Sequence, residues 1–155
     1  MRSRGKAASV ILVMMLTLVL LAGCGGKKEM NTDEVANRLL SEITYQDELG
    51  KMDLDTAGMI LNLSDLDIQS AAIYETSGWT AEEIVVLQLG STEDAAKAKT
   101  VLTTRVEEQK TNYVDYVPEE MDKLNVAVIE QIGDFAVLSV SNEPDKAKKI
   151  LSEYK

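Results

Sequence analysis

Apolar residues recur at helical spacing in three stretches of the chain. Val35, Leu39 and Ile43 predict a helix over residues 32–44, with Asn31 placed to cap its first turn. A longer helix is predicted over about 92–112, and a final helix begins near Asn142. The inner faces of these two helices consist of Ala95, Ala98, Leu102, Val106 and Tyr113 in the first and Ala147, Ile150, Leu151 and Tyr154 in the second.

Two further stretches have the composition of β-hairpins. Residues 68–76 and 82–89 are strand-like and flank a turn in which Gly78 is free to take a positive φ. Residues 125–131 and 135–141 form the second pair, with a turn at 132–134. The run Ile84-Val85-Val86-Leu87 is apolar without alternation, which predicts a central strand covered at least in part on both faces.

The predicted order is helix, hairpin, helix, hairpin, helix, with a short helix opening at Pro118. This order predicts an α+β fold: two layers, with a four-stranded, largely antiparallel sheet and helices packed on one face. Residues 45–65 have no clear pattern beyond one or two helical turns around 59–63. The predicted core consists of Val86, Leu87, Leu102, Val106, Val137 and Leu138.

The N-terminus has a different character from the rest of the chain. Basic residues at 2, 4 and 6 precede an uncharged apolar stretch, 7–22, that is shorter than the roughly 20 residues a membrane-spanning helix needs. The following Leu21-Ala22-Gly23-Cys24 resembles the lipobox of bacterial lipoproteins. That resemblance implies cleavage between Gly23 and Cys24 and a diacylglyceryl group on the Cys24 sulfur. An uncleaved signal anchor is the alternative, which the Gly-Cys-Gly-Gly-Lys-Lys continuation disfavours.

The lipobox resemblance divides the chain into three parts. Residues 1–23 are a lipoprotein signal peptide, 24–30 are the lipidated cysteine with a short tether, and 31–155 are a single α+β domain. Two acyl chains anchor a protein stably, so the expected location is the outer face of the cytoplasmic membrane, with the membrane as partner through the lipid.

The amino-acid composition excludes several classes of function. The chain has no His and one Cys, so His-dependent catalysis, an internal disulfide and cysteine metal clusters are excluded. A formal net charge of −10 argues against nucleic acid as a partner. No cofactor or metal site is expected; the run beginning at Asp53 starts like a calcium loop but has Ala57 and Ser64 where acidic ligands are needed.

Three stretches together resemble a bacterial lipoprotein domain family catalogued as domain of unknown function 4358, widespread in Gram-positive bacteria. They are residues 77–84 (SGWTAEEI), 113–120 (YVDYVPEE) and 133–141 (GDFAVLSVS). The resemblance spans about residues 31–152 and implies the fold. It brings no catalytic residues, because the family has no established activity.

Carboxylate pairs are the only candidate catalytic groups, at 82/83, 107/108 and 119/120. Neighbouring side chains diverge on a strand or helix, so no single pair makes a glycosidase-like site, and a solvated acidic surface is expected. Weak binding candidates are Glu83, Tyr113, Tyr116 and Glu119. Glu83 either ends a strand in solvent or accepts hydrogen bonds from the turn near Gly78. The tyrosines either pack in the core at a helix end or line an aromatic groove.

The resulting hypothesis is a membrane-anchored, non-catalytic domain with a role in binding or envelope assembly. The alternatives are an enzyme that uses carboxylates alone and a purely structural envelope protein.

Overall fold

The computed structural model describes residues 28–155. The predicted signal segment, Gly23 and Cys24 lie outside the described residues. Within the described part, no helix is both long enough and apolar enough to cross a bilayer.

Five antiparallel strands form one sheet in the order β1-β2-β3-β5-β4. The strands are β1 (Gly50–Met52), β2 (Ile68–Glu75), β3 (Glu83–Leu89), β4 (Val128–Ile132) and β5 (Phe135–Val140). Both predicted hairpins are present, and β5 pairs with β3, so the second hairpin lies beside the first with β4 at the outer edge. Gly78 has φ +97° in the first turn and Gly133 has φ +59° in the second, the conformation that glycine adopts without strain.

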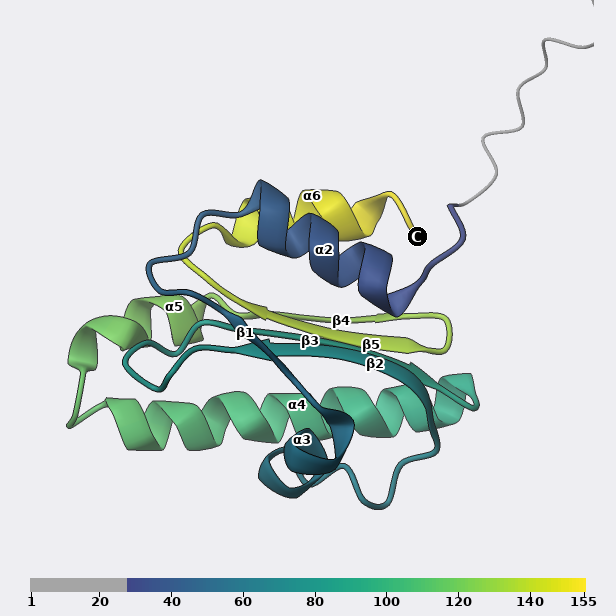
Figure 1. Cartoon of the computed structure of the whole chain (residues 1–155), viewed down its shortest axis with the longest axis horizontal. Coiled ribbons are helices and arrows are strands. Elements are labelled where there is room, and N and C mark those ends of the chain that lie inside the picture. The colour runs from purple at the N-terminus through teal and green to yellow at the C-terminus, as the bar shows by residue number, and fades with distance from the viewer. Residues whose placement is uncertain (1–27) are drawn as a thin grey trace, which may run out of the picture.

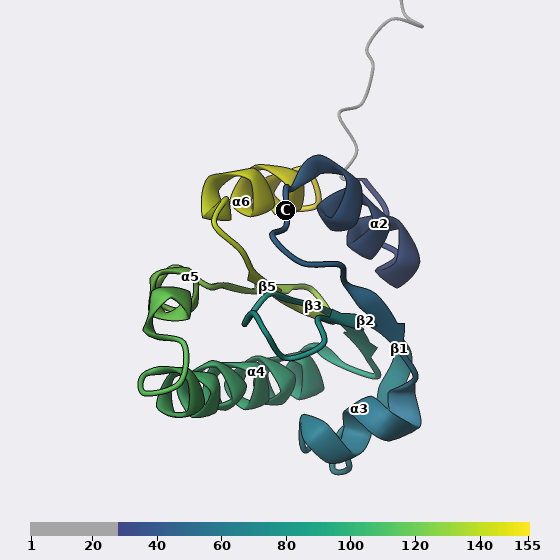
Figure 2. The ribbon, with the colours of Figure 1, turned by 60° about the vertical axis from the view of Figure 1, so that its left-hand side comes forward.

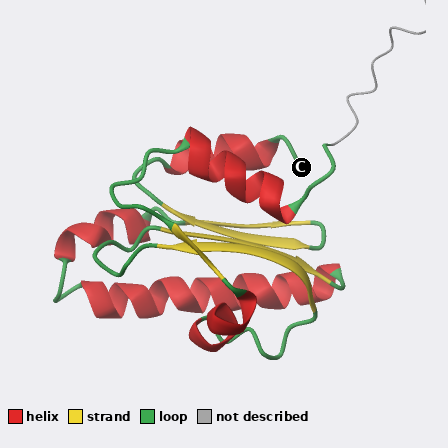
Figure 3. Ribbon diagram, viewed as in Figure 1, coloured by secondary structure: helices red, strands yellow, loops and turns green. Residues whose placement is uncertain are grey.

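Helices cover both faces of the sheet. On one face lie α2 (Thr32–Glu42) and α6 (Pro144–Ser152); on the other lie α3 (Leu54–Ile60) and α4 (Thr92–Tyr113), as Figures 1 and 2 show. A 3₁₀ turn, η2 (Pro118–Glu120), and α5 (Met121–Asn125) lead from α4 back to the sheet. Figure 3 shows the strands in yellow between the two helical layers.

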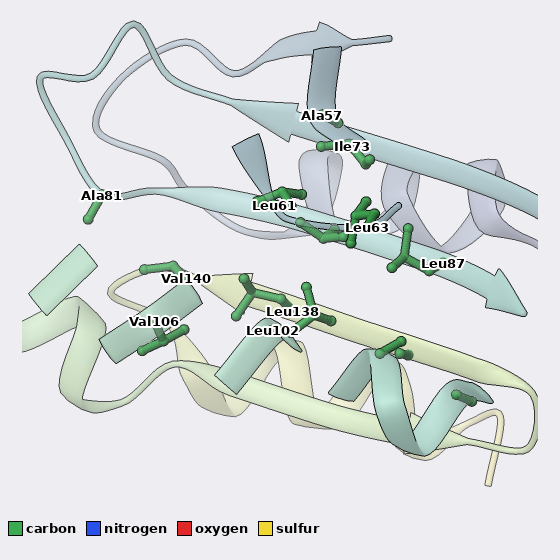
Figure 4. Close-up of a cluster of buried hydrophobic side chains, with 14 of the residues drawn as sticks. Ala57, Leu61, Leu63, Ile73, Ala81, Leu87, Leu102, Val106, Leu138 and Val140 are labelled. Atoms are coloured by element: carbon green, nitrogen blue, oxygen red, sulfur yellow. The ribbon is translucent and has the colours of Figure 1, made fainter. Parts of the chain in front are cut away.

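The central strands explain this arrangement. Val85 and Leu87 of β3 point into the cluster under α4, whereas Ile84 and Val86 point into the cluster under α2 and α6. Leu138 and Val137 of β5 divide in the same way between the two clusters. Burying both faces of the same strands needs two separate cores, and Figure 4 shows the one beneath α4.

The predicted fold is therefore corrected in two respects. The sheet has five strands where four were predicted, because β1 is a three-residue segment that pairs with the end of β2. The helices lie on both faces where one was predicted, which makes three layers, because α4 alone cannot cover strands that are apolar on both sides. The α+β class and the antiparallel pairing are confirmed.

The predicted cap at Asn31 is present, and Ser91 caps the start of α4. The Asn31 side chain accepts a hydrogen bond from the Glu34 amide, and the Ser91 hydroxyl accepts one from the Asp94 amide. The predicted core is confirmed, since each of its six residues is buried. The second hairpin begins later than predicted, at Val128, because Asn125 ends α5.

Candidate functional site

The turn between β2 and β3 is tied down by Tyr113 at the end of α4. The Tyr113 hydroxyl donates to the Thr80 carbonyl oxygen at 2.8 Å and lies 3.1 Å from that of Gly78. Thr76 also donates to the Thr80 carbonyl, at 2.7 Å. Burial, followed by the charge of Glu120, raises the pKa of Tyr113, so this hydroxyl stays a hydrogen-bond donor. Tyr113 therefore packs and clamps the turn.

Next to this turn, one arginine joins two carboxylates from neighbouring strands. Glu75 and Glu83 are directly opposite each other in the β2–β3 ladder. Arg105 of α4 donates through Nη2 to Glu75 Oε1 at 3.0 Å and through Nε to Glu83 Oε2 at 3.3 Å. The cross-strand pairing thus brings two carboxyl groups together under one guanidinium.

Glu83 combines nearly complete burial with a strongly raised pKa. The residue is 1% exposed, and as a carboxylate its Oε1 has no donor among the described residues. Burial raises the pKa of Glu83 to about 8; the positive charge of Arg105 opposes the rise, and Glu75 adds to it through its negative charge and through a hydrogen bond with Glu83. Loss of hydration outweighs the single ion pair, so Glu83 is mostly protonated at neutral pH and has Glu75 as its hydrogen-bond partner.

A half-open pocket of about 150 Å³ lies over these groups. Its walls include Glu75, Glu83, Arg105, Gln109 and Tyr113. β2, β3 and α4 therefore all contribute to one small polar cavity at the end of the sheet.

A second buried ionic group lies behind the pocket. Lys123 of α5 is 2% exposed, and its Nζ lies 3.2 Å from Glu82 Oε1 and 3.0 Å from Glu120 Oε1. Glu82 also accepts hydrogen bonds from the backbone amides of residues 46 and 47, and Glu120 accepts one from that of residue 81, at 2.8 Å. This group joins the segment after α2, the β2–β3 turn and α5, so its role is structural.

The structure brings together two of the four binding candidates. Glu83 and Tyr113 line the same pocket. Tyr116 is 68% exposed and Glu119 is also exposed, and neither lines that pocket. Glu83 contacts Arg105, and the turn amide of Ala81 is instead bound by Glu120.

The expectation that all three carboxylate pairs form a solvated surface is wrong. Glu82, Glu83 and Glu120 are buried, whereas Glu107, Glu108 and Glu119 are exposed. Glu75, Arg105 and Lys123 were missed as site residues because Arg105 pairs with Glu75 and Glu83 on other elements, and Lys123 with Glu82 in addition to the nearby Glu120. The one local signal for Glu75 was its position in the first hairpin, symmetric with Glu83 about the turn.

Asp53, at the start of the calcium-loop-like run, is the N-cap of α3. Its carboxylate accepts hydrogen bonds from the Thr56 amide at 2.9 Å and the Thr56 hydroxyl at 2.8 Å. Among residues 28–155, no three or more His, Cys, Asp or Glu side chains are grouped to hold a metal ion.

Fold and site together define a three-layer α+β domain with a small polar pocket at one end of an antiparallel sheet. The chain belongs to the family described as Domain of unknown function (DUF4358), whose family model matches residues 42–141. All three stretches that carry the resemblance lie within this range. No curated protein and no solved structure matches the chain.

Proposed function

We propose that the protein is a lipid-anchored extracytoplasmic domain with a non-catalytic binding role. Cleavage between Gly23 and Cys24 and acylation of Cys24 would place it on the outer face of the cytoplasmic membrane. The basic start, the uncharged 7–22 stretch and the lipobox-like sequence support this part of the proposal.

The position of the pocket supports an outward-facing domain. α2 begins at Thr32, and a six-residue tether reaches at most about 20 Å. The start of α2 lies at one end of the long axis, whereas the β2–β3 turn, the end of α4 and α5 lie at the other (Figure 1). Lys28 pairs with Glu34 and lies 5.2 Å from the Tyr154 ring centre, which holds Lys28, the first described residue, against α2 and the end of the chain. The pocket therefore lies at the end of the domain farther from the anchor.

The observation that carries the binding role is the half-open polar pocket of about 150 Å³ between β2, β3 and α4. Its walls offer a ligand the Arg105 guanidinium, the Gln109 amide and the carboxyl groups of Glu75 and Glu83. Exposed apolar side chains on α3, Leu54, Met59 and Ile60, also favour binding over a purely structural role.

One observation favours a carboxylate-dependent enzyme as the second candidate. A carboxyl with a pKa of about 8 is protonated at neutral pH and has the proton that a general acid needs. Its neighbour Glu75 is already ion-paired with Arg105, which makes Glu75 a poor base or nucleophile. The non-catalytic role therefore fits the geometry better.

The anchor is tested with a Cys24→Ser substitution in the full chain. We expect the variant to leave the membrane fraction or accumulate as an uncleaved precursor, because serine has no thiol to acylate. The measurement combines membrane fractionation with metabolic labelling by a clickable fatty acid. Gly26→Ser, two residues away, keeps the thiol and should behave as wild type.

Absence of fatty-acid label on the wild-type protein would refute the anchor. Label that persists on Cys24→Ser would show that acylation occurs elsewhere in the chain.

A further inference from the structure

An open groove of about 620 Å³ lies beside α3, which packs on the face of the sheet opposite α2 and α6 (Figures 1 and 2). Its walls come from α3 and from the segment that leads from α3 into β2. Half of its lining residues are large and apolar: Leu54, Met59, Leu63, Leu66 and Ile68. The volume is within the range of about 300–1,000 Å³ that is typical of ligand-binding clefts. The groove therefore has room for apolar side chains of another molecule.

Three large apolar side chains of α3 are in contact with water. Leu54 and Ile60 are each 40% exposed, and Met59 is 77% exposed. α3 has seven residues, of which only Ala57 is buried. Methionine is flexible and adapts its shape to different partners, which makes it common on binding surfaces. Most of the apolar surface of α3 is therefore left for a contact outside the domain.

Gly58 keeps the groove open. It lies inside α3 with an ordinary helical backbone, where glycine is less favourable than alanine by about 0.5–1 kcal/mol in general. A Cβ at this position would meet no atom within 4 Å, although the residue lines the groove. Neither the backbone nor the packing requires glycine here. The missing side chain therefore benefits the space beside α3 and not the fold.

The groove has acidic surroundings. Two aspartates line it and two more are their near neighbours in the chain: Asp55 and Asp67, and Asp53 and Asp65. The sequence from 52 to 96 has no lysine or arginine. The bases on either side of this stretch are engaged, since Lys51 pairs with Asp33 at 3.0 Å and Lys97 with Asp94 at 2.9 Å. The charge around the groove therefore complements lysine and arginine side chains of a partner.

This charge selects among the molecules that could cover an apolar groove. A surface of anionic lipids would repel the four aspartates. A second copy of the chain has the same formal net charge of −10 and the same acidic groove, so self-association is disfavoured. A basic segment with apolar side chains matches both the groove and the charge around it.

We infer that the groove beside α3 binds a short segment of a partner protein. Leucine or isoleucine side chains of the segment enter the groove, and lysine or arginine side chains on either side of them face the aspartates. The groove shares no lining residue with the polar pocket. The inference therefore goes beyond the proposed function and depends neither on that pocket nor on the anchor.

The experiment uses the full chain in nanodiscs of phosphatidylcholine, because a detergent would compete for an apolar groove. The probe is the peptide acetyl-Lys-Lys-Leu-Ala-Leu-Leu-Lys-Lys-amide with an uncharged fluorescent label, and fluorescence anisotropy measures its binding. One control peptide has serine in place of each leucine, and another has glutamate in place of each lysine. Empty nanodiscs give the signal that comes from lipid alone.

We expect saturable binding of the probe with a dissociation constant of about 100 μM, since few side chains are buried. The serine and glutamate peptides should each bind at least about tenfold more weakly, because one lacks the apolar anchors and the other meets like charges. Binding of the probe should also weaken about threefold when the salt concentration is raised from about 0.05 M to about 0.5 M.

Two pairs of variants locate the contact. Gly58→Leu should weaken binding at least about tenfold by filling the groove, and its melting temperature should not fall, because leucine favours a helix more than glycine does. Thr111→Leu adds the same side chain at an exposed position of α4 and should bind as wild type. Asp55→Asn should weaken binding about threefold, whereas Asp122→Asn, which removes an exposed carboxylate from α5, should have little effect.

Each contrary outcome overturns the inference. If Gly58→Leu binds the probe as tightly as wild type, the groove is not the contact. Equal binding of the serine peptide would show that charge alone attracts the probe, and equal binding of the glutamate peptide would show that the aspartates play no part. A signal no larger than that of empty nanodiscs would mean that the groove does not bind such segments. None of these outcomes involves the polar pocket, so the proposed function would remain intact.

Discussion

At the scale of single residues, two buried ionic groups at the same end of the sheet are satisfied in different ways. The Glu82–Lys123–Glu120 group has ion pairs and backbone amides for its carboxylates. In the Glu75–Arg105–Glu83 group, burial keeps Glu83 protonated, and its proton takes the place of a second cation. All three members of this group line the pocket, whereas only Glu82 of the other group does, so the first is the candidate for binding and the second is structural.

Lys123→Met tests the structural group. Removal of the ammonium leaves Glu82 and Glu120 buried close together without their shared cation, so we expect unfolding free energy to fall by about 3–5 kcal/mol. Urea unfolding followed by circular dichroism at pH 7 measures the change. Lys148→Met is the control, because Lys148 is exposed on α6.

A loss for Lys123→Met no larger than that for Lys148→Met would contradict this assignment. It would mean that the backbone amides alone stabilise the two carboxylates.

At the scale of elements, α4 connects the core to the site. Ala95, Ala98, Leu102 and Val106 face the sheet at the predicted spacing, and all are buried. The same helix places Arg105 and Tyr113 at the pocket. Packing of the apolar face therefore sets the position of the groups that hold Glu83.

Leu102→Ala tests this packing. Leu102 is fully buried among Leu87, Leu138 and their neighbours (Figure 4). Truncation should lower the unfolding free energy by about 2–5 kcal/mol, through lost burial and a cavity. Thr103→Ala, at an exposed position on the same helix, is the control for helix propensity and should have a much smaller effect. An unchanged melting temperature in Leu102→Ala would show that this face does not hold α4 to the sheet.

At the scale of the whole molecule, the start of α2 and the pocket lie at opposite ends of the domain. The start of α2 and the C-terminus lie at one end of the sheet, and the β2–β3 turn with α5 lies at the other (Figure 1). A lipid on Cys24 would hold the first end at the membrane. The pocket would then open toward the surroundings of the cell, where a soluble ligand or a partner can reach it.

We also expect no turnover when the full chain is assayed with generic esterase, phosphatase, peptidase and glycosidase substrates, with and without divalent metals. The sequence has no His, and Glu75, which is opposite Glu83 in the β2–β3 ladder, is paired with Arg105, so we expect no activating base. Turnover that disappears in Glu83→Gln and persists in Glu119→Gln would place catalysis in the pocket. That result would favour the carboxylate-dependent enzyme.

Local sequence patterns by themselves determined most of the helices and strands. Helix α4, both hairpins and the caps at Asn31 and Ser91 depend on contacts within a few residues, which periodicity and capping residues reveal. The six core residues followed from the same apolar faces. The lipobox-like motif is also local, which is why a hypothesis about Cys24 needs no tertiary structure.

Only the tertiary structure decided the rest. Strand β1 has three residues and no apolar pattern, so it is defined by its pairing with β2. The split of the helices between two faces depends on how the hairpins lie side by side. The burial of Glu82, Glu83, Glu120 and Lys123 arises from partners 3 to 41 positions apart along the chain. From the sequence alone, a charged residue is expected to be solvated, because the partner that would allow its burial is unknown. Partners on separate elements are brought together only when the sheet and helices pack.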